Sequence, residues 1–421
     1  MATVSRGLPD RPHLDVPKRE ARELLSEWRN GDRDALERIR HRHPRFAASD
    51  DAAIAAGTFR LADAQLVVAR EYGFAHWAEL KQRIEANALA RELSVAIRND
   101  DVAAAVRIVE TEPNLLHVPL WSGNWGPPMS HAANLGRLRI VEAMAARGAR
   151  DVQHAFDRAL LQGQLECARW LHARGAVLAP GIVMGSCETL MRSGFDLLVE
   201  LGAPITNDRG DRLAPLALVL QTYARRAAGK HAILDSFARL GYALPDSPIM
   251  AFHRGSVEDL EKHLHRDPSL LARRFALREI YPSELGCQGD GGMHWTPIAG
   301  TTLLHLAIDF EEREIFEWLL ARGADVDARA AVDADGFGGH TPLFNAVLGH
   351  PGGDATFASA LLERGADTRL RASLRKFLDW CEEPRWHEAR NATAAEWGHG
   401  FPERGWVNTA ALALLDQAPR P

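Results

Sequence analysis

The stretch "LLHLAIDFEEREIFEWLLARGADVDA", residues 303–328, decides the fold of this chain. Its apolar residues at 315, 316, 319 and 320 follow the i, i+1, i+4, i+5 spacing of a helix with one buried face. Gly323 comes directly after that helix. A glycine just past the last turn adopts the left-handed conformation without a Cβ clash. The letters "RGA" are therefore predicted to end a helix here.

The same three letters return three more times, each after an apolar, helix-like run. They stand at residues 147–149, 174–176 and 364–366. Gly365, in the last copy, is predicted to end its helix as Gly323 does. Three other helix-like runs stop at a proline, at positions 44, 113 and 268, because proline cannot continue a helix. The chain therefore repeats one unit, a pair of helices with a fixed stop.

The upstream half of the unit recurs as well. The segments "TLLHLAIDFE" (302–311), "TPLFNAVLGH" (341–350) and "PPMSHAANLG" (127–136) align without gaps. Followed by a second helix and G-A-D, this pattern resembles the ankyrin repeat, which is nominally 33 residues long. The resemblance implies a structural role for His305, which would bond backbone groups in its turn. Ser130 and Phe344 replace the family histidine, so those two turns must be held by other means.

Stacking lets neighbouring helix pairs bury apolar faces that a single pair cannot bury. We therefore predict an all-α fold, an ankyrin-type helix-pair solenoid with irregular long hairpin or loop inserts and helical caps. Residues 1–88 are expected to form an N-terminal helical leader and residues 89–376 divergent ankyrin repeats. Residues 377–421, rich in Trp, are expected to form a C-terminal cap, with an exposed aromatic docking surface as the alternative. The basic run 369–376 is interpreted as a solvated helix face.

Three segments between helix pairs are enlarged: 117–129, 272–300 and 329–341. Loops this long inside a compact array are usually functional or disordered, and aromatic residues are typical of binding hot spots. The alternative is that each Trp packs down and holds its own loop in place. The candidate partner-binding residues in these inserts are Trp121, Trp125, Trp295, Phe337 and His340.

The later inserts also carry side chains that catalysis or metal binding would need. A Cys–His nucleophilic pair or a metal site could be drawn from Cys287, His294 and His340 with the acids Asp290 and Asp335. No motif spacing requires such a site. We therefore predict no catalytic residue, no metal ligand and no cofactor, and consider an enzyme the less favoured class.

Composition limits the classes of partner and the cellular compartment that we expect. A net charge of −6 argues against a general nucleic-acid binder, although a DNA-reading helix pair within 50–88 is a competing interpretation. No run of about 18 apolar residues occurs, so no membrane span is expected. Four scattered cysteines without a CxxC pair favour reduced thiols in a cytoplasm. The Arg- and Ala-rich composition and the leader indicate a bacterial protein.

The sequence favours a protein–protein interaction module. Its concave face and aromatic inserts would bind a macromolecular partner, expected to be a protein of unknown identity. The runner-up is a small-molecule-binding or catalytic protein that uses a pocket between inserts 272–300 and 329–341. Ankyrin-type folds serve many partners, so the fold alone does not choose between these functions.

Overall fold

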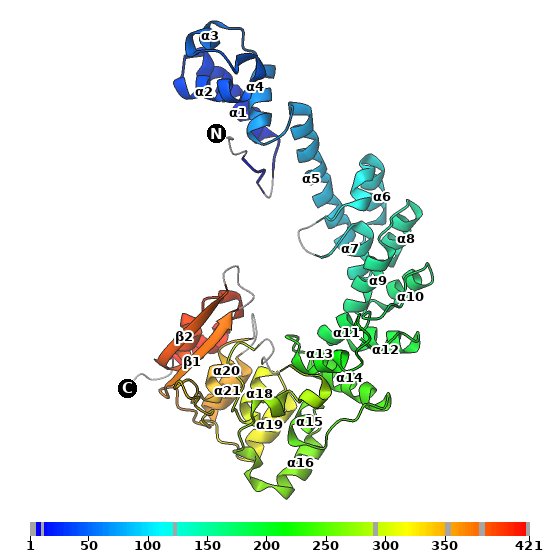
Figure 1. Cartoon of the computed structure of the whole chain (residues 1–421), viewed down its shortest axis with the longest axis vertical. Helices are drawn as coiled ribbons and strands as arrows, with labels where there is room; N and C mark the ends of the chain where they lie inside the picture. The colour runs from blue at the N-terminus through cyan, green and yellow to red at the C-terminus, as the bar shows by residue number, and fades with distance from the viewer. Residues whose placement is uncertain are drawn as a thin grey trace. The chain divides into compact units, whose positions relative to one another are not determined.

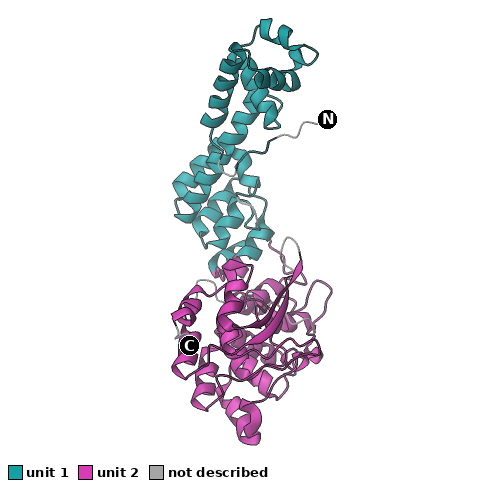
Figure 2. Ribbon diagram, turned by 90° about the vertical axis from the view of Figure 1, so that its left-hand side faces the viewer, with its two compact units in different colours: residues 1–158, 166–175 teal, residues 159–165, 176–421 magenta. Residues whose placement is uncertain are grey.

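The computed structural model describes residues 6–9, 12–120, 124–288, 294–349, 355–378 and 384–417. These residues form mainly α-helices and one two-stranded sheet (Figure 1). The chain divides into two compact units, residues 1–158 with 166–175 and residues 159–165 with 176–421 (Figure 2). The prediction of an all-α helix-pair solenoid is confirmed.

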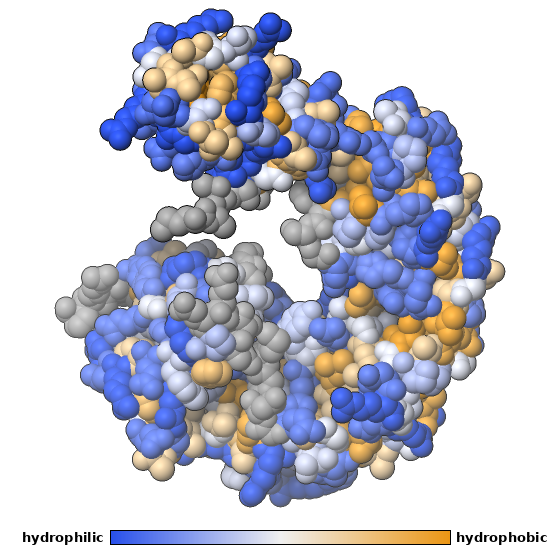
Figure 3. Space-filling view, turned by 45° about the horizontal axis from the view of Figure 1, so that its top comes forward, coloured by the Kyte–Doolittle hydropathy of each residue, from blue (hydrophilic) through white to orange (hydrophobic). Residues whose placement is uncertain are grey.

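The first unit opens with a small helical bundle. Its helices are α1 (Asp15–Arg29), α2 (Arg33–Arg42), α3 (Asp51–Ala56) and α4 (Leu61–Glu71). They enclose an apolar core that includes Leu24, Ile39, Ile54 and Val67, all fully buried. Charged residues cover much of the outside, as the space-filling view shows (Figure 3). Helix α5 (Trp77–Arg98) continues without a break past residue 88, where the predicted leader ends.

Helix pairs follow along the chain. They comprise α6 (Val102–Thr111), α7 (Pro128–Asn134), α8 (Leu138–Ala146), α9 (Val152–Leu161) and α10 (Leu165–His172). Helix α5 packs on α6 and α7, and α8 packs on both of these. Where the family histidine is missing, the amide and hydroxyl of Ser130 donate hydrogen bonds of 3.0 and 2.5 Å to the Asp151 carboxylate. The side chain of Asp151, directly before helix α9, thus holds that turn.

The second unit is also built from helix pairs. Its helix pairs are α11 (Met184–Glu188) with α12 (Arg192–Glu200), α13 (Ala214–Gln221) with α14 (Ala227–Arg239), α15 (Pro248–His253) with α16 (Val257–Arg266), α18 (Leu303–Asp309) with α19 (Arg313–Ala321), and α20 (Pro342–Ala346) with α21 (Thr356–Glu363). Successive pairs touch, as α11 does with α13 and α18 with α20. A short helix, α17 (Leu277–Ile280), lies within the longest insert.

Helix stops follow the two predicted rules. Helices α2, α6 and α16 each end just before a 3₁₀ turn that begins at Pro44, Pro113 or Pro268. Gly323 and Gly365 follow helices α19 and α21 with φ of +82° and +83°. A Cβ added at either glycine would meet nothing within 4 Å. The left-handed backbone is therefore the reason that these positions favour glycine.

The C-terminal segment differs in part from the prediction. Residues 369–376 were expected on a helix face, yet β1 (Ala372–Leu378) pairs antiparallel with β2 (Arg385–Ala392). The burial of Ala372, Leu374 and Leu378 follows the period of a strand, which the basic residues between them obscure. A last helix pair, α22 (Ala394–Gly400) and α23 (Thr409–Gln417), stacks on α20 and α21.

Candidate functional site

Backbone hydrogen bonds join the inserts of the second unit into a ladder. Two links join the two ends of insert 272–300, a third joins this insert to insert 329–341, and Gly338 brings the ladder to β1. The links are Phe275 N to Thr301 O (2.9 Å), Gly300 N to Phe275 O (2.8 Å), Ala331 N to Gly300 O (2.8 Å) and Gly338 N to Ser373 O (2.6 Å). These bonds satisfy backbone groups that loops would otherwise leave to solvent.

A pocket of about 470 Å³ lies across this ladder, and we call it the finger pocket. Insert 272–300, insert 329–341 and the β1–β2 hairpin all contribute to it. Its lining residues are Ala276, Leu277, Pro297, Ala299, Gly300, Ala331, Val332, Asp333, Phe337, Gly338, His340, Leu374, Arg375 and Trp386. The lining is mainly apolar with a few polar groups, which is the usual composition of a ligand-binding site.

Large apolar side chains are exposed at this pocket. Val332 is 61% exposed and Trp386 58%, and both belong to the lining. Phe377, 40% exposed, lies opposite Trp386 on the hairpin with ring centroids 5.3 Å apart. Single exposed apolar residues are ordinary on a protein surface, whereas several together mark an interaction site.

Phe337 lies inside the pocket wall and is buried. The guanidinium groups of Arg375 and Arg390 lie over its ring, 4.6 and 4.1 Å from the centroid. Arg375 is fixed in turn by the carboxylates of Asp333 and Asp335, at 2.8 and 2.7 Å. The aromatic ring and the ion pairs together connect the 329–341 insert to the hairpin.

His340 and His305 form the buried back of this region. Nε2 of His305 donates to the carbonyl of His340 at 3.2 Å, and its Nδ1 accepts from the Thr302 hydroxyl at 2.9 Å. Burial lowers the pKa of His305 to about 3 and that of His340 to about 4. Neither ring nitrogen of His340 has a partner with good hydrogen-bond geometry. The backbone of Pro297 nevertheless raises the pKa of His340 and so offsets part of the effect of burial.

Comparison with known proteins identifies the repeat. Residues 299–331 match the family model described as ankyrin repeat. These residues form an ankyrin repeat. Among solved structures, the human ASB11 ankyrin repeat domain is similar at 18% identity and a TM-score of 0.23, covering 70% of this chain and 99% of that one. No curated protein sequence matches the chain.

The predicted partner-binding residues have different surroundings. Trp295 is buried and stacks on Trp406 with ring centroids 3.9 Å apart, and Phe337 and His340 are buried as well. Phe337 and His340 nevertheless line the finger pocket, whereas Trp295 does not. Trp125 is 38% exposed and meets His131 edge to face at 5.0 Å. Trp121 lies outside the described residues.

Two of the side chains considered for catalysis, His294 and Cys287, are buried. His294 is held by Asp309 and Tyr281, and burial raises the pKa of the Cys287 thiol to about 12, which leaves it protonated. Asp290 lies outside the described residues. Among the residues that the structure describes, no group of three or more His, Cys, Asp or Glu side chains is arranged to hold a metal ion.

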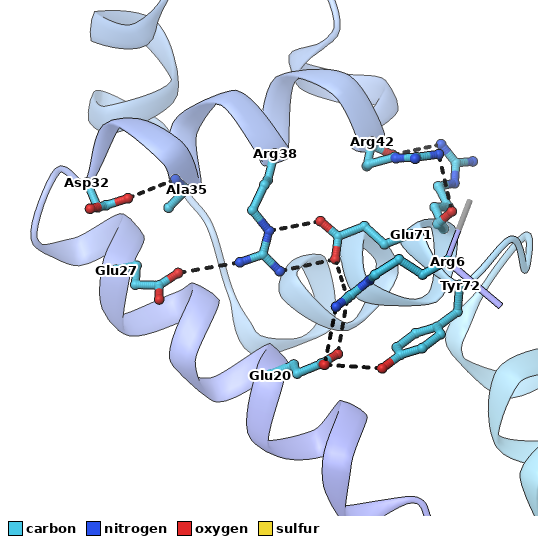
Figure 4. Close-up of polar contacts among 10 residues, drawn as sticks. Arg6, Glu20, Glu27, Asp32, Ala35, Arg38, Arg42, Glu71 and Tyr72 are labelled. Atoms are coloured by element: carbon cyan, nitrogen blue, oxygen red, sulfur yellow. Dashed lines mark hydrogen bonds and ion pairs between the residues drawn. The ribbon is translucent and has the colours of Figure 1, made fainter. Parts of the chain in front are cut away.

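The N-terminal bundle holds a second, charged cavity of about 550 Å³ that the sequence did not predict. The Arg38 guanidinium donates two hydrogen bonds to the Glu71 carboxylate, at 2.8 and 3.1 Å, and Arg6 donates one to the same group at 3.0 Å (Figure 4). Glu20 accepts from Arg6 and from the hydroxyl of Tyr72. The contacts join α1, α2 and α4 with the segment before α1, so we interpret this network as structural.

Proposed function

We propose that this ankyrin-repeat protein is an interaction module that binds a protein partner through the finger pocket. The exposure of Val332 and Trp386 at the pocket is the observation that carries the proposal. A partner side chain in the pocket would remove apolar surface from water, and such anchors dominate the energy of most interfaces. Ankyrin repeats in general serve as protein-binding units, which agrees with this choice.

The aromatic insert of the first unit offers a separate candidate contact. Trp125, in the 117–129 insert, is the exposed aromatic residue of the first unit that the sequence singled out. Trp121 remains a candidate on the sequence alone. We propose that Trp125 and the finger pocket each contribute to binding, and that Trp295 contributes only by holding its insert in place.

The compartment belongs to the proposal too. Cys167, Cys187 and Cys287 are free and buried, which supports a reducing cytoplasm. No helix in the described part of the chain is long and apolar enough to cross a membrane. We propose a protein partner in place of nucleic acid or a membrane, and a bacterial source remains a compositional proposal.

Affinity capture with matched variants tests the function. Tagged wild-type protein, Val332→Asp, Trp386→Ala and the control Val177→Asp are compared by quantitative mass spectrometry. Val177 is 61% exposed, as Val332 is, but does not line the pocket. One partner should be lost with the two pocket variants and kept with the control. A partner retained by all four proteins would place the binding surface elsewhere.

A second candidate function is favoured by the size of the pocket. Its volume of about 470 Å³ falls within the range of small-molecule sites, roughly 300–1,000 Å³. Native mass spectrometry of the purified protein would detect a retained compound. A compound that Val332→Asp displaces, with no protein partner captured, would favour this candidate.

A further inference from the structure

Insert 272–300 is anchored by a histidine in the interior of the second unit. His294 is buried, as are Asp309 and Tyr281, which its ring nitrogens meet. A guanidinium nitrogen of Arg225 also lies 3.4 Å from Nδ1 of His294. Nδ1 of His294 donates to the Asp309 carboxylate, and Nε2 meets the hydroxyl of Tyr281. Tyr281 and His294 belong to the insert, whereas Asp309 ends helix α18. The contact therefore fixes the insert to the repeat that follows it.

Asp309 is fixed from a third element. Arg225, just before α14, donates to the Asp309 carboxylate at 3.2 Å and to its backbone carbonyl at 2.6 Å. Both side chains are more than nine-tenths buried. Beside them, Lys230 and Glu312 form a second buried ion pair at 2.5 Å. Buried charges of this kind are stable only when they are paired, so losing one partner is costly.

The anchored insert supplies one wall of the finger pocket. Pro297, Ala299 and Gly300 follow His294 closely and line the pocket, and Ala276 and Leu277 line it from the other end of the insert. The far side of the insert is tied by the Gln221 side chain, which bonds the backbone of Gln288 at 2.6 and 3.0 Å. The position of His294 therefore bears on the shape of the pocket.

We propose that Asp309, His294 and Tyr281 form a latch, and that the wall of the finger pocket is held in place only while His294 is neutral. The latch is a positioning device, because none of its three side chains lines the pocket. The latch rests on the proposed function only in that partner binding would be the role of the pocket whose wall it holds. The latch itself can be tested without a partner.

Hydrogen-bond chemistry explains the dependence on the neutral form. A neutral His294 donates from Nδ1 to Asp309 and accepts at Nε2 from Tyr281, so both nitrogens are satisfied. A protonated ring would carry a proton on both nitrogens and could no longer accept from the hydroxyl. Its charge would also have to be accommodated away from water.

The charges around His294 favour the same form. Burial lowers its pKa most, Asp309 offsets part of that shift, and Arg225 and Lys376 of β1 lower the pKa further. From the neighbouring elements, His253 on α15 and Lys230 on α14 share this electrostatic environment. Because the folded pKa is below the ordinary value of 6.5, the latch is secure above that pH and weakens as the pH falls below it.

Hydrogen exchange measured by mass spectrometry tests the latch on the full chain. The reporters are the amides of Phe275, Gly300 and Ala331, whose ladder bonds involve the insert. After correction for intrinsic rates, their protection should fall about tenfold or more between about pH 7.5 and pH 5. Protection that stays constant over this range would overturn the proposal.

Substitutions separate the latch from general acid sensitivity. His294→Asn keeps a donor toward Asp309 but does not titrate, so its reporter protection should lose the pH dependence. Tyr281→Phe removes only one hydroxyl and should lower protection at every pH, and it serves as the second variant where His294→Asn fails to fold. The control His131→Asn removes a buried histidine of the first unit and should leave the reporters unchanged. His294→Asn with wild-type pH dependence would contradict the latch.

Failure of the latch and failure of the proposed function have different signatures. If the pocket binds no partner, exchange should still show the pH-dependent insert. If the latch is wrong, the reporters of the wild-type protein show no pH dependence, while Val332→Asp still abolishes partner capture.

Discussion

Trp295 and Trp406 stack with their ring centroids 3.9 Å apart, which joins the longest insert to the C-terminal segment. The amide of Gly349 donates to the Trp406 carbonyl at 2.9 Å and brings α20 into the same contact. The pair thus connects three segments far apart in the sequence. Since Trp295 is buried, its contribution should be to stability.

Trp295→Ala should lower the free energy of unfolding by about 3 kcal/mol or more, as large-to-small changes at buried aromatic residues do. Chemical denaturation followed by circular dichroism measures this. Trp295→Phe keeps a ring against Trp406 and should cost less. An unchanged denaturation midpoint together with lost partner affinity would show instead that Trp295 is a contact residue.

Gly323→Ala should destabilise the protein by about 1 kcal/mol, because its φ of +82° is unfavourable for a residue with a Cβ. Nothing within 4 Å would obstruct the new methyl group, so backbone conformation alone is tested. Gly405→Ala is the control, since Gly405 has equally open surroundings without a positive φ. Equal melting temperatures for the two variants would argue against a left-handed helix stop.

Glu71→Gln should destabilise the N-terminal bundle by roughly 1–2 kcal/mol, because Arg38 and Arg6 would lose the carboxylate they share. Both arginines are partly exposed, and solvent screening limits the cost. Glu37→Gln, a change in an exposed residue of the same cavity, provides the comparison. Thermal unfolding of the two variants should differ, and coincident curves would remove the structural role assigned to the network.

Stability should fall on acidification below about pH 6.5. Burial lowers the pKa of His131 and His340 to about 4 and that of His253 and His305 to about 3. As the pH falls, each of these histidines is therefore protonated at a higher pH in the unfolded chain than in the folded chain. Their contribution is present above the unfolded pKa and declines by about 1.4 kcal/mol per pH unit for each such histidine. Denaturation midpoints that stay constant from about pH 7 to pH 5 would contradict these environments.

The repeated architecture could be predicted from the sequence because its signals are local. The glycines after α19 and α21 and the prolines after α2, α6 and α16 act within one helix turn, and each helix ends where they indicate. The pocket between inserts 272–300 and 329–341 followed from their length and position. The hairpin at 372–392 did not, because its buried residues alternate among basic ones.

The exposure of individual side chains could not be predicted in the same way. Trp295 was predicted as a surface anchor, yet it is buried and stacks on the distant Trp406. Val332 carries no motif, and Trp386 was predicted only as part of a Trp-rich cap or, as the alternative, of an exposed docking surface; both are exposed at the pocket. Burial depends on contacts between segments far apart in the chain, which residue type and spacing do not encode.

The most direct test of the central claim is the affinity of the captured partner for Val332→Asp against Val177→Asp. Isothermal titration with purified proteins gives both dissociation constants. The finger-pocket account predicts a loss of about 2 kcal/mol or more for Val332→Asp and wild-type affinity for Val177→Asp. Equal affinity for the two variants would contradict it.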